Sequence, residues 1–348
     1  MLRRNKGLKE KMTSNEKTTL PYKGSFQRIL LATLAGASAL TMSASAETLS
    51  EPRDNSLEQT AANYILFRED VNLLETTTFN NAEATREAHK RLSSHNSKEI
   101  SAGWVAFAAL VAAETPEFAA SLQNEVKEKR RRRRKELGGR DAFFAKLSQD
   151  PTYARQLPGA EKAMDRVLQM TLQDGQRIYA LGESFKTQAY AMQKTRWGKA
   201  RIASSSTRLK EADGFKNSRS EMEVGSMDGE TTGGVTTPSL SSTNPNWSAD
   251  WGANAPAGNM NEKNAQVIMD RVLNLAARYS VDGLNPKIVN VYARNDRAEQ
   301  CLSLAALTLR QCIAATRTSY EEAFCLGEHG LNDVATCTGW IVGADGAS

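Results

Sequence analysis

Four cysteines constrain the fold of this 348-residue chain, and all of them lie between residues 301 and 337. Cys301 and Cys312 are 11 positions apart, about 20° of rotation and about 16 Å of rise on a helix, so they share a face but cannot bond to each other. A turn after Cys312 would return Cys325 and Cys337 along this face, in positions symmetric about residue 319. This symmetry predicts an antiparallel helical hairpin with nested disulfides, Cys301 to Cys337 and Cys312 to Cys325. The crossed pairing is the alternative.

A metal site is the competing interpretation of the same residues. Cys-x10-Cys and Cys-x11-Cys are poor zinc spacings, and His329 alone does not complete a ligand set. We therefore predict two disulfides, no metal and no cofactor. Each bridge would stabilise a small domain by roughly 2 to 4 kcal/mol.

The N-terminal segment Met1–Ala46 has the pattern of a secretory signal peptide. Basic residues precede an apolar stretch from Ile29 to Met42, and Ala44-Ser45-Ala46 supplies small residues for cleavage. The basic region is long, so Met12 is an alternative start. An uncleaved anchor is the competitor, but 14 residues is short against the roughly 20 that span a bilayer. With the disulfides, this predicts a soluble protein of the bacterial periplasm, alternatively a secreted one, without an integral membrane span after cleavage.

Charge is unevenly spread in the predicted mature chain. Removing residues 1–46 takes away eight of the 45 basic and two of the 40 acidic residues, which leaves 37 against 38. Residues 127–135, KEKRRRRRK, form a basic run that could bind an anionic lipid or polysaccharide through charge-assisted contacts. A solvated helix end is the competing interpretation, and nucleic acid is disfavoured because no aromatic residues interleave the run. The basic residues are Lys127, Lys129, Arg130, Arg131, Arg132, Arg133, Arg134 and Lys135.

Apolar residues at helical spacing predict helices through residues 56–201. The segment Ile100–Ala113 is apolar on every side, which places it in the middle of a helical bundle. A long helix is predicted from Gly159 to about Lys199. It carries a seam of alternating large and small residues at heptad spacing, which we assign to packing within the chain in preference to a dimer. The seam consists of Met164, Leu168, Thr171, Gly175, Ile178, Gly182, Phe185, Ala189 and Met192.

Composition changes after Ala203, where Ser, Thr, Gly, Asn and Pro dominate as far as Asn259. We predict a disordered linker over residues 203–259, with Trp247 and Trp251 as a candidate partner-docking pair or as a segment that folds back on its own domain. The predicted fold class is all-α. It comprises a helical bundle at residues 47–202, the linker, and a small disulfide-linked helical domain at 260–348 with helices over 261–279 and 287–317.

Catalytic motifs are scarce. The three histidines form no metalloprotease motif, and we expect His89 and His95 to be exposed; no G-x-S-x-G, P-loop or dinucleotide fingerprint occurs. Glu183-Ser184-Phe185 followed by Met192-Gln193 resembles the Glu-Ser and Met-Gln elements of lytic transglycosylases, which implies Glu183 as a catalytic acid acting on cell wall. The resemblance lacks the glycine-rich stretch between these elements, and an exposed helix position is the preferred interpretation of Glu183.

These observations predict an exported, non-enzymatic interaction or structural protein of the cell envelope. Its partner would be an envelope protein or an anionic lipid or polysaccharide, and an oligomer is compatible with the pattern. The alternatives are a periplasmic enzyme acting on cell wall and a component of a secretion or pilus-like assembly.

Overall fold

A computed structural model describes residues 56–132, 138–226 and 260–342; within these, the side chains of residues 129–132 and 219–226 are not described. The predicted signal segment and its cleavage site lie outside the described residues. The described part is helical, apart from an isolated antiparallel bridge between Arg201 and Thr318. The all-α class is thereby confirmed.

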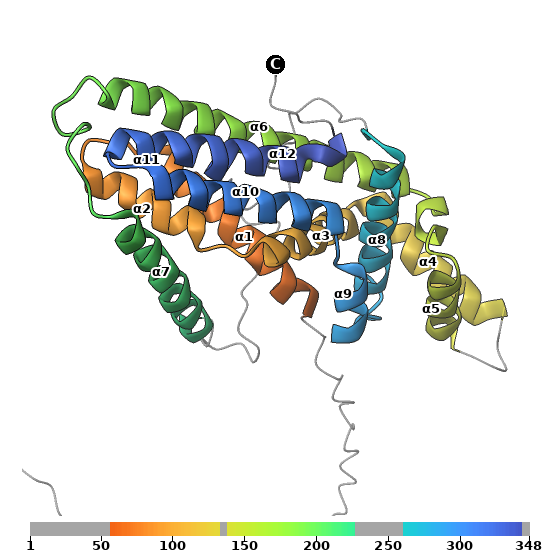
Figure 1. Cartoon of the computed structure of the whole chain (residues 1–348). Coiled ribbons are helices and arrows are strands. Elements are labelled where there is room, and N and C mark those ends of the chain that lie inside the picture. The colour runs from red at the N-terminus through yellow and green to blue at the C-terminus, as the bar shows by residue number, and fades with distance from the viewer. Residues whose placement is uncertain (1–55, 133–137, 227–259, 343–348) are drawn as a thin grey trace, which may run out of the picture. The chain divides into compact units, whose positions relative to one another are not determined.

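Most helices follow one another with short connections, but residues 193–204 form a longer loop between α6 and α7, and the connection from α7 to α8 lies largely outside the described residues (Figure 1). Their bounds are α1 Ser56–Glu75, α2 Ala82–Ser93, α3 Ser97–Ala113, α4 Pro116–Arg132, α5 Gly139–Gln149, a 3-10 turn Tyr153–Gln156, α6 Ala160–Met192, α7 Ser205–Ser226, α8 Lys263–Tyr279, α9 Pro286–Tyr292, α10 Asp296–Ala315, α11 Ser319–Cys325, a π-helical turn Leu326–Asn332, α12 Asp333–Gly339 and a 3-10 turn Trp340–Val342.

The centre of the fold is α3. Every residue from Gly103 to Ala113 is buried, because α1, α6, α8 and α10 all pack against this helix. A Cβ at Gly103 would lie 2.7 Å from the backbone nitrogen of Tyr64, so glycine lets α1 and α3 approach closely. The predicted position of this apolar helix in the middle of the bundle is confirmed.

The packing of α3 also changes the predicted domain organisation. The described residues from 56 to 342 form one compact unit, in which α8 and α10 from the predicted C-terminal domain lie directly against α3 from the predicted N-terminal bundle. Two separate domains are not observed, because a helix that is apolar all round needs neighbours on every side and the segment before residue 202 does not supply them all.

The predicted linker and the predicted helix 287–317 also differ from the structure. Residues 205–226 are helical as α7, and this helix packs against α2 and α10; residues 227–259 lie outside the described part. The helix predicted over 287–317 is divided into α9 and α10, because the side chain of Asn295 accepts a hydrogen bond from the nitrogen of Ala298 and begins a new helix.

The seam of α6 packs within the chain, as predicted. Its buried residues face α11, the π-helical turn and α12. A Cβ at Gly182 would lie 2.8 Å from the carbonyl oxygen of Gly327 and would overlap the side chain of Asn332, so this glycine permits the close approach of the π-helical turn.

Candidate functional site

The C-terminal helices form the hairpin that the cysteine spacing predicts. The structure joins Cys301 to Cys337 and Cys312 to Cys325, with Cα–Cα distances of 5.4 Å and 5.7 Å. The nested pairing is confirmed, and the crossed pairing is excluded. Such disulfides are consistent with an oxidising, extracytoplasmic compartment.

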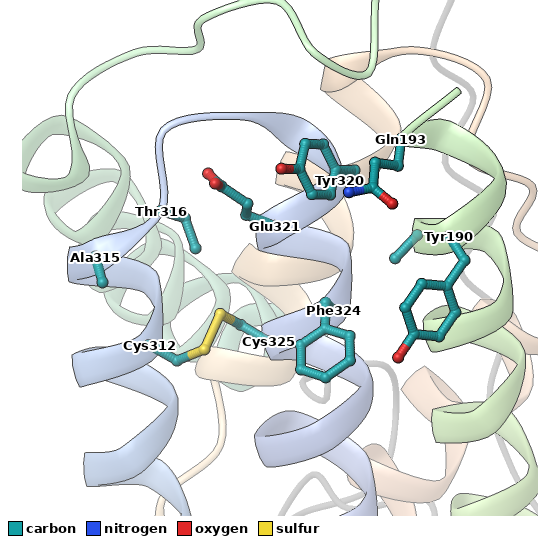
Figure 2. A pocket seen from close by; sticks show the side chains of 10 residues that line it. Tyr190, Gln193, Cys312, Ala315, Thr316, Tyr320, Glu321, Phe324 and Cys325 are labelled. Atoms are coloured by element: carbon teal, nitrogen blue, oxygen red, sulfur yellow. A yellow bond between two sulfur atoms is a disulfide. The ribbon is translucent and has the colours of Figure 1, made fainter. Parts of the chain in front are cut away.

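A hollow of about 330 Å³ lies beside the second disulfide, where the end of α6 meets α10 and α11 (Figure 2). Tyr190 stands on one side, 58% exposed, and its ring centroid is 6.0 Å from that of Phe324 in an edge-to-face arrangement. The lining residues are Ala189, Tyr190, Gln193, Cys312, Ala315, Thr316, Tyr320, Glu321, Phe324 and Cys325. Apolar surface dominates this lining, and the volume is at the small end of ligand pockets.

Hydrogen bonds at the start of α11 fix the wall of the hollow. The carboxylate of Glu321 accepts from the backbone nitrogens of Arg317, at 2.7 Å, and Thr318, at 3.0 Å. Thr318 and Glu321 thus form the capping box of α11. The bonded oxygen of Glu321 is used by the fold, so the hollow is preformed on a rigid helix end.

A buried ionic cluster holds this helix end to the rest of the molecule. Glu322, 1% exposed, lies 3.0 Å from Nη1 of Arg208 and 3.2 Å from Nδ1 of His89. Arg208 comes from α7 and His89 from α2. The expected exposure of His89 is therefore wrong, because its ring faces the interior carboxylate. All three side chains are at most 2% exposed, so we assign the cluster a structural role.

A second buried cluster joins α1 to α6. Arg68 lies 3.3 Å from Asp174, and the hydroxyl of Tyr64 donates to the same carboxylate at 2.8 Å. Burial raises the pKa of Asp174 above its ordinary value, while the guanidinium of Arg68 opposes this rise. These side chains are enclosed by the core, and a role in orienting α6 fits their burial.

Glu183 lies on α6 away from the hollow. Its carboxylate is 2.8 Å from Nζ of Lys186 and accepts from Nδ2 of Asn332 at 2.7 Å. The hydrogen bond from Lys186 and then that from Asn332 hold the pKa of Glu183 below its usual range. A catalytic acid must be protonated at working pH, so this environment disfavours the role that the transglycosylase resemblance implies.

The basic run begins on α4 and continues beyond the described residues. Lys127 is exposed, and the helix extends to Arg132. Lys162 of the first turn of α6 pairs with Glu117 of α4 at 2.5 Å, so α4 packs near the opposite end of α6 from the hollow. Lys129 to Lys135 have no described side chains, and Trp247 and Trp251 lie outside the described residues altogether.

The sequence contains signals for the hairpin but not for the hollow. Tyr190, Tyr320 and Phe324 come from two helices 130 positions apart, and their spacing in the chain forms no motif. Among the described residues, no group of three or more histidine, cysteine or acidic side chains is placed to hold a metal ion.

No single helix in the described ranges is long and apolar enough to cross a membrane, although α3 and α4 together, bent by 80°, reach the required length and composition. In comparisons with known proteins, no family model, no curated protein and no solved structure matches the chain.

Proposed function

We propose that the chain is an exported, non-enzymatic interaction protein that binds a protein partner at the hollow beside the Cys312–Cys325 disulfide. The observation that carries this proposal is the combination of a mostly apolar hollow with partly exposed aromatic rings on a fixed frame (Figure 2). Binding hot spots are typically preformed pockets that receive one large apolar or aromatic side chain. A cell-envelope location, periplasmic or secreted, is part of the proposal and rests on the signal pattern and the disulfides.

The occupant that fits this lining is an apolar side chain of a protein. Tyr190, Phe324 and the neighbouring Ala189 and Ala315 offer carbon surface, whereas one carboxylate oxygen of Glu321 is bonded to its own helix cap. Such an interaction would resist salt, because it depends on apolar burial.

The test is capture of envelope proteins by the oxidised protein at low and high salt. Tyr190→Glu places a charge at the rim of the hollow. Its matched control is Leu73→Glu, because Leu73 on α1 is an apolar side chain that is 49% exposed. We expect a salt-resistant partner that Tyr190→Glu loses and Leu73→Glu retains. The identified partner should then bind the purified protein at least about 10-fold more weakly after Tyr190→Glu, measured by titration calorimetry. A partner that both variants retain, or no salt-resistant partner, would refute the hollow as a binding site.

The basic run supports a second candidate function, binding of anionic lipid or polysaccharide. Its support is the density of arginines in the sequence that follows the exposed Lys127 of α4. Replacement of Arg130 to Arg134 by Gln should abolish co-sedimentation with vesicles that contain anionic lipid, and salt should weaken the binding of the unmodified protein. Equal sedimentation of both forms would eliminate this candidate.

The enzymatic alternative has its own test. Glu183→Gln should leave partner capture unchanged in an interaction protein and should abolish release of soluble fragments from cell wall in a lytic enzyme. The low pKa of Glu183 favours the first outcome.

A further inference from the structure

The outward side of α10 carries few charges after its first turn, which is unusual for this chain. Between Gln300 and Thr316 the only charged residue is Arg310, whereas 24% of the whole chain is charged. The guanidinium of Arg310 donates to both carboxylate oxygens of Asp213 on α7, at 2.8 Å and 3.3 Å. Its charge is therefore balanced within the chain.

Two leucines on this side of α10 are exposed to solvent. Leu304 is 63% exposed and Leu307 is 52% exposed, and Gln300 and Gln311 beside them are exposed too. Of the large apolar side chains that are exposed in the described part of the chain, these two are the pair that share one helix. The spacing of 4, 3 and 4 positions places all four residues in one stripe along the helix.

The order of residue types in this stripe is the same in both chain directions. Gln, Leu, Leu and Gln follow each other at a symmetric spacing about the point between residues 305 and 306. A two-fold axis through that point, perpendicular to α10, places Leu304 of one copy against Leu307 of another, and Gln300 against Gln311. Two-fold contacts need a patch that is complementary to itself, and this sequence meets the condition.

We propose that α10 is a self-association surface, on which a second copy of this chain packs its own α10 antiparallel. The pairing buries four leucines and brings no like charges together, since Arg310 is the only charged residue between Gln300 and Thr316 and is paired with Asp213 of its own chain. Exposed Ser303 and Ala306 beside the stripe are small, which permits the two backbones to approach closely. The surface uses other side chains than the hollow, so the inference goes beyond the proposed function and can fail independently of it.

The size of the surface sets the expected affinity. The stripe covers three helical turns, about 17 Å of helix at 1.5 Å per residue. Such a contact buries less than the roughly 1,200 Å² that stable complexes need. We therefore expect a reversible dimer with a dissociation constant of about 10 μM to 1 mM.

The first experiment measures the mass of the oxidised, naturally processed protein by sedimentation equilibrium up to about 1 mM, the weak limit of this range. We expect reversible dimerisation, which the double variant Leu304→Glu, Leu307→Glu weakens by about 100-fold or more because it places like charges opposite each other. Val291→Glu is the matched control, since Val291 on α9 is also 63% exposed. This control should dimerise as the unmodified protein does.

A second variant tests the orientation. Leu304→Lys with Leu307→Glu in the same chain puts Lys against Glu in an antiparallel pair but Lys against Lys in a parallel one. We expect this variant to dimerise more strongly than the double glutamate variant, and salt should reduce the difference. A protein that stays monomeric at the highest concentration, or a dimer that the double glutamate variant leaves intact, would overturn the proposal. Equal loss of the dimer in both double variants would overturn the antiparallel pairing.

Discussion

Arg208 donates hydrogen bonds to Glu322 and to three backbone carbonyls although it is only 2% exposed. The carbonyls belong to Ala203, Ile313 and Thr316, so one side chain of α7 joins the segment before its own helix to the end of α10 and the turn before α11. From composition alone, Arg208 lies in a Ser-rich segment that we predicted to be a linker. Three of these four contacts are with residues more than 100 positions away, and no local pattern predicts them.

Arg208→Met should cost about 3 to 5 kcal/mol of unfolding free energy, because Glu322 would remain buried without its main cationic partner. Urea denaturation followed by circular dichroism measures this loss. Arg310→Met is the control, since the exposed pair with Asp213 should contribute only about 0 to 1 kcal/mol. Similar losses for both variants would contradict the structural role of the buried cluster.

Asp270 on α8 gives a prediction on pH. Burial raises the pKa of Asp270 above its ordinary value, although Arg155 at 3.4 Å opposes the rise. The folded protein therefore holds this proton more tightly than the unfolded chain does, and this residue's contribution to stability falls as the pH rises from about 4 toward the folded-state pKa.

Asp270→Asn should remove this fall. The stability of the variant relative to that of the unmodified protein should therefore be higher at pH 7 than at pH 4. The measurement is the difference in melting temperature between variant and unmodified protein, taken at pH 4 and at pH 7. A difference that is the same at both pH values would show that Asp270 titrates alike in the folded and unfolded states.

At the scale of helices, the contact between α6 and the π-helical turn depends on Gly182. Gly182→Ala should cost about 1 to 3 kcal/mol, because the added Cβ meets the carbonyl of Gly327 and the side chain of Asn332. Gly214→Ala on α7 is the matched control, since nothing lies within 4 Å of its Cβ position. This control should stabilise by about 0.5 to 1 kcal/mol through the lower backbone entropy of the unfolded chain.

The two alanine variants are expected to change the free energy of unfolding in opposite directions. Thermal unfolding of both variants measures this difference. If Gly182→Ala is also stabilising, the close approach of α6 to the π-helical turn is absent in solution. The unmodified protein provides the reference for both shifts.

The helices themselves follow from local sequence, and their partners do not. The buried side of α6 and the central place of α3 could be predicted from apolar spacing, and the disulfide pairs from symmetry about residue 319. The division between α9 and α10 could not, because Asn295 begins a new helix inside an otherwise continuous helical pattern. The hollow also could not, since its rings meet only when α11 lies on α6.

At the scale of the whole molecule, α3 makes the N-terminal and C-terminal helices depend on each other. Trp104 on α3 and Trp340 after α12 are buried reporters from the two regions. Variants that keep one of these tryptophans and replace the others by Phe should unfold at the same urea concentration, because the described residues from 56 to 342 form one compact unit. Two separate fluorescence midpoints would instead show that the regions unfold independently.

The bridge between Arg201 and Thr318 has a consequence for the time course of folding. Ile202 donates to the carbonyl of Arg317 at 3.1 Å, and much of the buried side of α6 packs against residues 319–339. When the N-terminus of the chain emerges first, almost the whole chain must therefore emerge before α6 is fully covered. Contacts over such separations form slowly. Under the export that we propose, this delay would keep the precursor unfolded while it passes through a membrane pore.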